Sequence, residues 1–260
     1  MEKQTPRIYA PDVDILIIVG NFGSGKTEVA VNLALHLRRS GRKVQIADLD
    51  LVNPYFRCRE ARDLMEKEGI RVVVPSRGFH WADLPIVLPE VKGMLDQEGE
   101  VVIFDVGGDD IGARMLASFA PTINDRPHKM LQVVNERRPF TDSPEGVLRI
   151  MREIEEASRV RVKGLISNAH LMEETTVDVI RTGYELCCET GRRTGLPIEF
   201  VAVPDRLDPN HTVFFFDVPI LWIERIMLPP HLEAAKRSRE EEDRTRALRP
   251  RPLWAPRREA

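Results

Sequence analysis

The segment "GNFGSGKT" follows the apolar run "DILIIV" and precedes a helix-compatible stretch, "TEVAVNLALHLRRSG". Its spacing, Gly20-x-x-x-x-Gly25-Lys26-Thr27, is the pattern of a phosphate-binding loop. Glycines let successive backbone N–H groups face phosphate oxygens, the lysine reaches the β- and γ-phosphates, and the threonine hydroxyl ligates magnesium. The flanking strand and helix argue against a glycine-rich turn that binds nothing. We therefore predict a nucleotide site whose contacts from this segment are Gly20, Asn21, Phe22, Gly23, Ser24, Gly25, Lys26, Thr27 and Glu28.

Two aspartates end the apolar segment "VQIADLD", namely Asp48 and Asp50. Alternate residues of an extended chain point the same way, so both carboxylates can face the loop. One can then hold a magnesium-bound water while the other orients or activates the water that attacks the nucleotide. A helix N-cap or a turn-forming aspartate remains the alternative for each residue.

A third aspartate ends the buried-type run in "VVIFDVGGDD". Asp105 occupies the place where a P-loop enzyme holds magnesium through water, at the carboxyl end of a strand. Gly107 and Gly108 follow it and allow a backbone N–H to approach a γ-phosphate and to move when that phosphate leaves. An ordinary strand-to-turn sequence is the alternative.

The elements that position these residues alternate along the chain. Strand-like apolar runs are separated by helix-like stretches, a pattern that predicts right-handed βαβ crossovers. The fold class is therefore α/β, a doubly wound, mostly parallel sheet with helices on both faces. In "HTVFFFDVPILWIERIM" we expect a short strand followed by a short helix. The expected strands are "DILIIV", "KVQIAD", "IRVVVP", "EVVIFDV", "KMLQVV", "RVKGLIS" and "IEFVAV", and the expected helices are 28–39, 54–68, 85–96, 111–119, 144–157 and 175–194.

Composition sets limits on the class of protein. The 260 residues, 42% hydrophobic and 30% charged, carry a net charge of −3, which does not favour nucleic acid or anionic lipid as a partner. No apolar run has the length of a membrane span, and the N-terminus lacks the apolar core of a secretory signal. The three cysteines form neither a disulfide framework nor a metal-binding spacing, so we expect a cytoplasmic protein. We expect a nucleotide-binding domain over residues 1–228 and a charged, Pro/Arg-rich, mobile tail over 229–260.

The stretches "GNFGSGKTEVAVNLALHLRRSGRKVQIADLDL" and "VVIFDVGGDD" together resemble the ParA/MinD/CobQ/CobB-type nucleotide-binding domains of the SIMIBI class of P-loop NTPases. The resemblance spans roughly residues 12 to 205. It implies a protein that uses ATP and magnesium, and it implies a possible homodimer, because many members form nucleotide-sandwich dimers. It also implies that Asp50 orients the attacking water, that Asp48 is an outer magnesium partner, and that Asp105 holds the metal through water.

The chain departs from that family's pattern at Asn21. In the partitioning and division-site ATPases the loop reads K-G-G-x-G-K-T, and aligning Gly23, Gly25, Lys26 and Thr27 places Asn21 at the first lysine. That lysine reaches the partner subunit's phosphates, a charge that asparagine cannot supply. The "GSGKT" half also resembles the loop of GTPases that insert nickel into enzymes, although those relatives usually carry an N-K-x-D guanine motif and Cys/His metal sites.

The base is expected to lie near the ends of two later strands. "VKGLISNAH" ends at Asn168, where related NTPases set an amide against the base edge, and "VAVPDRLD" ends at Pro204 and Asp205, which resemble the loop that closes over the base. Leu171 stands where a guanine-specific protein would have aspartate, which favours adenine. For Asn168 an Asx-turn at a strand end remains the alternative.

These observations predict a magnesium-dependent ATP-binding protein that hydrolyses ATP slowly and acts as a switch on a protein partner. "DLVNPYFRCREARD", after Asp50, is a candidate partner contact through Arg57, or else an amphipathic helix. One alternative is a biosynthetic enzyme of the CobB/dethiobiotin-synthetase kind that phosphorylates a small carboxylate. Its second pocket would come from "PSRGFHWADLP" and "VNERRPF". Another alternative is a GTP-driven metallochaperone.

Overall fold

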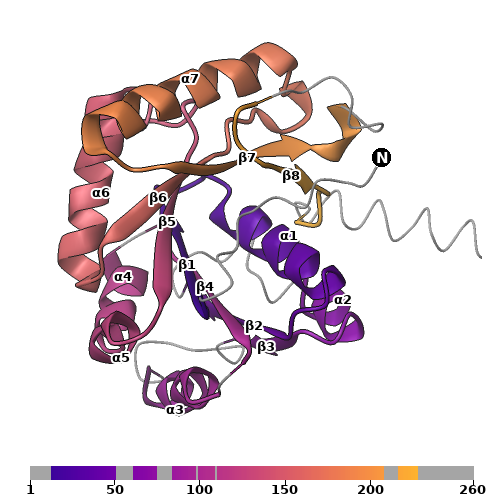
Figure 1. The fold of residues 1–260 in the computed structure, drawn as a ribbon, viewed down its shortest axis with the longest axis vertical. Helices are drawn as coiled ribbons and strands as arrows, with labels where there is room; N and C mark the ends of the chain where they lie inside the picture. The colour runs from indigo at the N-terminus through magenta and orange to yellow at the C-terminus, as the bar shows by residue number, and fades with distance from the viewer. Residues whose placement is uncertain are drawn as a thin grey trace, which may run out of the picture. The chain divides into compact units, whose positions relative to one another are not determined.

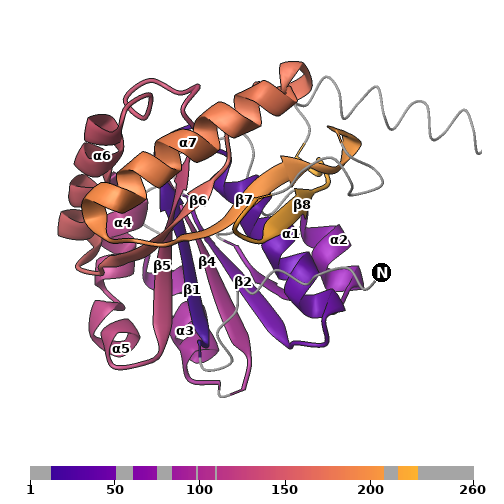
Figure 2. The ribbon, with the colours of Figure 1, turned by 45° about the horizontal axis from the view of Figure 1, so that its top comes forward.

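The strands of the protein assemble into one parallel sheet. The structure, a computed structural model, describes residues 13–50, 61–74, 84–97, 99–108, 110–207 and 216–227. Within them the strand order is β3-β2-β4-β1-β5-β6-β7-β8, and every paired neighbour is parallel (Figures 1 and 2). The predicted α/β fold is confirmed. The strands are β1 Ile15–Gly20, β2 Val44–Leu49, β3 Arg71–Val73, β4 Val101–Val106, β5 His128–Val134, β6 Val162–Ser167, β7 Ile198–Pro204 and β8 Ile220–Ile223.

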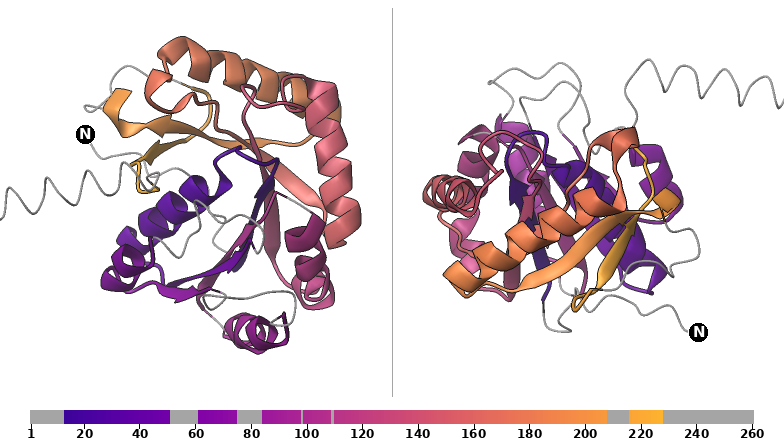
Figure 3. Two further views of the ribbon diagram at one scale, coloured as in Figure 1. Left: turned by 180° about the vertical axis from the view of Figure 1, so that it is seen from behind. Right: turned by 90° about the horizontal axis from the view of Figure 1, so that it is seen from above.

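Helices cover both faces of this sheet (Figures 1 and 3). Helices α1 and α2 lie on one face, and α3 to α7 lie on the other. The described helices are α1 Lys26–Arg39, α2 Arg62–Lys67, α3 Leu84–Leu95, α4 Asp110–Ala117, α5 Ala120–Asn124, α6 Pro144–Ser158 and α7 Val177–Thr194, with short 3-10 turns η3 Met172–Glu174 and η4 Asp205–Leu207.

The central strand shows why its sequence is apolar throughout. In β1, Leu16 and Ile18 point into the core under α1, while Ile15 and Ile17 point into the core on the opposite face. All four are fully buried. A strand buried on both faces has no polar side, which explains why "ILIIV" lacks the alternation of a half-exposed strand.

The order of the strands decides where the phosphate loop lies. β1 has β4 on one side and β5 on the other, and the chain leaves β1 through α1 to reach β2, beyond β4. The loop between β1 and α1 therefore opens at the carboxyl ends of the strands, where the connections diverge. Such switch points are where open α/β sheets bind ligands.

One local expectation was wrong. Within "HTVFFFDVPILWIERIM" a short strand is present as β8, Ile220–Ile223, which pairs in parallel with β7, but no helix follows it among the described residues 216–227. The N–H groups of residues 224, 226 and 227 bond to side chains of α1 in place of helical carbonyls. The helix expected over 111–119 is α4, Asp110–Ala117, and a separate helix, α5, begins at Ala120.

The far edge of the sheet returns to helix α1 (Figure 1). The Asn32 side chain accepts a hydrogen bond from the Glu224 N–H at 2.9 Å and donates to the Glu224 carbonyl at 3.0 Å. Ile226 and Met227 pack into the same core as α1. Residues 224–227, which we call the return segment, are thus fixed against the helix that begins at the phosphate loop.

Several predicted features lie outside the described residues. They are residues 51–60 of the partner-contact segment "DLVNPYFRCREARD", which include Arg57, residues 75–83 of the second-pocket segment "PSRGFHWADLP", and the tail over 229–260.

Candidate functional site: the phosphate loop and its two sides

The phosphate loop ends in a left-handed residue that starts helix α1. Gly25 caps the helix with φ 86°, a conformation that costs glycine little and other residues more. A Cβ at Gly25 would also lie 2.4 Å from Nδ2 of Asn168. Lys26, the first helical residue, is buried and donates from Nζ to the Asn21 carbonyl at 3.0 Å. The lysine ammonium is therefore held over the loop, beside the N–H groups of the helix start, which favour anions.

The aspartates predicted from sequence meet beside this lysine. Asp48 on β2 and Asp105 on β4 are paired in register, and both are buried. Asp50, also buried, donates its backbone N–H to Oδ1 of Asp48 at 2.9 Å. The structure thus brings the three carboxylates to one edge of the sheet.

Asp105 is the most strongly perturbed of these groups. Burial, and then the neighbouring Asp48 carboxylate, raise its pKa well above the usual value. The Thr27 hydroxyl and the Lys26 ammonium act in the opposite direction. Neither carboxylate oxygen of Asp105 makes a hydrogen bond of normal geometry with the described residues. A buried carboxylate oxygen without a hydrogen-bond donor destabilises the fold, and a bound cation or a water on that cation would supply the missing interaction.

The residues present fit magnesium. Among the described residues no group of three or more His, Cys, Asp or Glu side chains is arranged to hold a metal alone. Magnesium does not need such a cage, because it keeps several waters and takes one or two carboxylates together with substrate phosphates. Thr27, Asp105 and Asp48 supply oxygen ligands of the required type.

Gly108 closes this side of the loop. A Cβ on Gly108 would lie 2.7 Å from the Phe22 nitrogen and 2.9 Å from Nζ of Lys26. The turn after Asp105 is therefore packed against both the loop and its lysine, with Gly107 immediately before it. Any larger residue at position 108 would displace one of them.

On the other side, the ends of β5 and β6 are bonded to the loop. Asn168, predicted to read the base, donates from Nδ2 to the Ser24 carbonyl at 2.7 Å in a buried contact. His170 lies close as well, since a Cβ on Gly25 would be 3.0 Å from its Nε2. Burial, followed by the charges of Arg138 and Arg225, lowers the pKa of His170 to about 4. The imidazole is therefore neutral at physiological pH.

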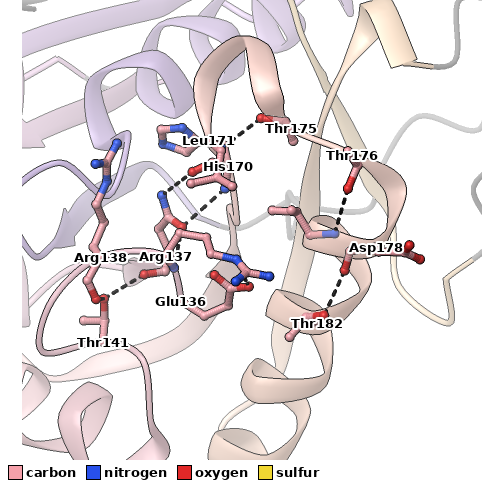
Figure 4. A network of polar contacts seen from close by, with 12 residues as sticks. Glu136, Arg137, Arg138, Thr141, His170, Leu171, Thr175, Thr176, Asp178 and Thr182 are labelled. Carbon is pink, nitrogen blue, oxygen red and sulfur yellow. Dashed lines mark hydrogen bonds and ion pairs between the residues drawn. The ribbon is translucent and has the colours of Figure 1, made fainter.

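The segment between β5 and α6, residues 135–141, makes two further bonds to the loop. Arg138 donates from Nε to the Gly23 carbonyl at 2.9 Å, and Nδ2 of Asn21 donates to the Pro139 carbonyl at 2.8 Å. Asn135 joins this segment to the end of β6, because its amide accepts from the His170 N–H and donates to the His170 carbonyl, both at 3.3 Å (Figure 4). We call residues 135–141 the bracing loop.

Sequence reasoning missed the bracing loop as part of the phosphate site. "VNERRPF" was considered only as a source of a second pocket. β5 pairs with β1, so its carboxyl end lies beside the loop, but this strand order is a result of the structure and no sequence motif indicates it.

The side chain of Glu28, a predicted nucleotide contact, bonds to the return segment. Its carboxylate accepts hydrogen bonds from the N–H groups of Ile226 and Met227, at 2.7 and 3.1 Å. Burial raises the pKa of Glu28, and these two donors lower it in part. The residue next to Thr27 therefore holds the return segment.

The predicted base-closing residues lie at the end of β7. Pro204 is its last residue and Asp205 opens η4. Arg206 donates to the carbonyls of Met172 and Glu173, which ties η4 to the turn after β6. The turns that follow β6 and β7 are thus joined.

The chain is similar to several known proteins. No protein-family model matches the chain. It is 32% identical over 96 residues to the cytosolic Fe-S cluster assembly factor cfd1 of Emericella nidulans, covering 37% of this chain and 27% of that protein. It is 29% identical over 204 residues to the signal recognition particle 54 kDa protein of Methanopyrus kandleri, covering 76% of this chain and 40% of that protein. The chain thus spans less than half the length of these relatives.

Solved structures share the fold. The cell division protein FtsY of Thermotoga maritima superposes with a TM-score of 0.55 and 23% identity, over 78% of this chain and 66% of that one. The signal recognition particle 54 kDa protein of Aeropyrum pernix, in complex with GDP, gives a TM-score of 0.52 at 23% identity, over 76% of this chain and 43% of that one. In sequence and in fold the chain is thus similar to P-loop NTPases of the SIMIBI class. The class predicted from the loop and the strand-end aspartates is confirmed.

No helix among the described residues has the length and apolar character needed to cross a membrane.

Proposed function

We propose that the protein binds magnesium ATP, hydrolyses it slowly, and acts on a protein partner according to its nucleotide state. The observation that supports this most directly is the group formed by Lys26, Asp48, Asp50 and Asp105, closed by Gly108 at the γ-phosphate end of the loop. A cation, buried carboxylates and backbone N–H groups are thus gathered at the switch point of the sheet.

Each residue has a distinct task in the proposed reaction. Backbone N–H groups of residues 21–26 and the Lys26 ammonium stabilise the charge that develops on the transferred phosphoryl group. Thr27 and Asp105 would hold magnesium, with Asp48 beside them, and the metal would supply further neutralisation of phosphate charge. Asp50 positions the attacking water. Gly107 and Gly108, packed on the loop, move when the γ-phosphate leaves.

Two exposed aromatic rings beside the loop support an action on a partner. Phe22 is 67% exposed and Phe140 is 61% exposed, although most large apolar side chains of the described residues are buried. They flank the two ends of the hydrogen bond between Asn21 and Pro139. Phe140 is also held in the left-handed region at φ 70°, which costs about 1–3 kcal/mol. Rings presented in this way, next to the nucleotide, suit contact with another protein.

Resemblance to an Fe-S cluster assembly factor and to signal recognition particle proteins leaves the choice of nucleotide as a matter for experiment. We favour ATP because Leu171 stands where a guanine-pairing aspartate would be needed. Titration with fluorescent ATP and GTP analogues under identical magnesium conditions tests this. A tenfold or greater preference for GTP would refute the ATP assignment while leaving the phosphate site intact.

Substituting Lys26 tests the central claim. Lys26→Ala removes the ammonium held over the loop, and we expect affinity for magnesium ATP to fall about 100-fold or more, because a charge-assisted contact inside the site is lost. Isothermal titration calorimetry measures the loss. The control is Lys43→Ala, which removes an exposed lysine just before β2, at the opposite end of the sheet. Unchanged nucleotide affinity in Lys26→Ala would refute the proposed site.

A further inference from the structure

The bracing loop carries a second cation to the phosphate loop. Arg138 uses Nε to bond the Gly23 carbonyl. An arginine has further N–H donors on its two terminal nitrogens, in a planar fork that suits phosphate oxygens. Figure 4 shows Arg137 and Arg138 diverging: Arg137 turns to Glu136, and Arg138 turns to the side of His170. Of these two consecutive arginines, Arg137 forms an ion pair with Glu136 and Arg138 bonds to the phosphate loop.

Arg138 contacts the first half of the phosphate loop. Its side chain lies 3.3 Å from the position of a Cβ on Gly23, the residue after Phe22. Gly108 approaches both the Phe22 nitrogen and Nζ of Lys26. Because a P-loop lysine reaches the β- and γ-phosphates, a guanidinium at this point would lie nearer the γ-phosphate than the α-phosphate of a bound triphosphate.

The arginine is also held in place before any nucleotide binds. The bracing loop closes on itself, because the buried Thr141 hydroxyl donates to the Asn135 carbonyl at 2.8 Å and the Thr141 N–H donates to the Arg138 carbonyl at 3.2 Å. Asn21 fastens this turn to the phosphate loop through Pro139. A charged group fixed in this way loses little freedom on contacting phosphate, which is the condition for effective electrostatic stabilisation.

We infer that Arg138 is a γ-phosphate sensor that acts within the same chain: its guanidinium recognises the terminal phosphate and distinguishes a triphosphate from a diphosphate. This inference rests on the proposed nucleotide binding. In it, Asn21 is a positioning residue, because it anchors the turn from which Arg138 reaches the loop. The bracing loop would then report the presence of the γ-phosphate to the exposed ring of Phe140, two residues away.

The decisive measurement is the ratio of two affinities in one set of variants. AMP-PNP and ADP, each with magnesium, are titrated into the full chain and into Arg138→Ala, Arg138→Lys and the matched control Arg137→Ala. For Arg138→Ala we expect AMP-PNP affinity to fall about 10- to 100-fold, the range of a charge-assisted hydrogen bond, with ADP affinity changed by less than about 3-fold. Arg138→Lys retains the charge without the fork and should recover part of the loss. Arg137→Ala should leave the ratio unchanged.

Other results separate the possible failures. If Arg138→Ala weakens AMP-PNP and ADP equally and lowers the melting temperature without nucleotide, Arg138 is a brace of the loop and the inference is wrong. An unchanged ratio with unchanged stability also overturns it. Failure of the parent chain to bind either nucleotide, or their guanine counterparts GMP-PNP and GDP, would instead refute the proposed function and the inference with it.

Discussion

On the β2–β4 side of the phosphate loop, the carboxylates of Asp48 and Asp105 are buried next to each other, and the Asp105 oxygens make no normal hydrogen bond with the described chain. On the β5–β6 side, by contrast, Asn168, Arg138 and Asn21 join the loop to its neighbours through side-chain bonds of 2.7 to 2.9 Å. We call the β2–β4 side the incomplete side, because the Asp105 carboxylate oxygens lack hydrogen bonds of normal geometry with the described residues. We call the β5–β6 side the satisfied side, because its side chains are hydrogen-bonded to the loop in the absence of a ligand.

The contrast indicates that one side of the loop binds the ligand and that the other side fixes the conformation of the loop. Burying the carboxylates of the incomplete side costs desolvation free energy, and we expect binding of a cation to offset that cost. On the satisfied side, the amides of Asn21 and Asn168 keep the loop in the conformation that presents its N–H groups. Substitutions on the two sides should therefore affect function and stability in different proportions.

The largest effect is expected at Asp105. Asp105→Asn removes the ionisable group whose pKa is raised by burial and by Asp48, so the free energy of unfolding without ligands should stay unchanged or rise. Turnover of magnesium ATP should fall about 100-fold, because an oxygen ligand for the metal is weakened. Steady-state kinetics and urea unfolding of the same preparation give both quantities. A loss of stability equal to the loss of function would mean that Asp105 is structural, and the contrast would fail on this side.

A smaller loss of function but a clear loss of stability is expected at Asn168. Asn168→Ala leaves the buried Ser24 carbonyl without its donor, at a cost of about 1–3 kcal/mol in the free energy of unfolding. Asn124→Ala is the matched control, because its amide makes an exposed 3.2 Å bond to the Arg159 carbonyl and should cost under about 1 kcal/mol. Urea unfolding compares the two variants. Parent-like stability in Asn168→Ala, combined with a changed preference between ATP and GTP, would show that this amide reads the base.

The smallest effect is a change of stability with pH at His170. The folded pKa of about 4 lies below the ordinary 6.5, so the unfolded chain binds more protons between these values, and stability must fall as pH falls through that window. From pH 7.5 to 5 this one group should remove about 2 kcal/mol. His170→Asn should remove that part of the pH dependence, measured as the difference between parent and variant in urea unfolding at the two pH values. Parallel pH profiles for the two proteins would contradict the burial of a neutral imidazole here.

The incomplete side was predictable from sequence, and the satisfied side was not. Asp48, Asp50 and Asp105 each end an apolar run, and parallel strands bring such ends to one edge of a sheet. The partners of Asn168 and Arg138 are backbone carbonyls of the phosphate loop, which every residue possesses, so no residue type signals them. Asn168 was found as a strand-end residue, but the structure shows its amide donating to the loop, a bond that strand-end logic cannot predict.

A similar limit applies to the last strand. The run Ile220–Ile223 has no helical or strand periodicity of its own, and contact with β7 and α1 makes it a strand. The Glu28 carboxylate bonds to Ile226 and Met227, almost two hundred positions away in the chain. Long-range backbone contacts of this kind are not encoded in a local pattern.

The hydrogen bonds from Ile226 and Met227 to Glu28 have a practical consequence for handling the protein. A truncated version ending at Ile223 would keep all eight described strands, yet it would deprive Glu28 and Asn32 of their partners and uncover the core around Met227. The truncation would therefore destabilise the first turns of α1, next to Thr27, as well as the new C-terminus. The minimal expression boundary for a working nucleotide site therefore lies beyond Met227, at the opposite end of the chain from the loop it protects.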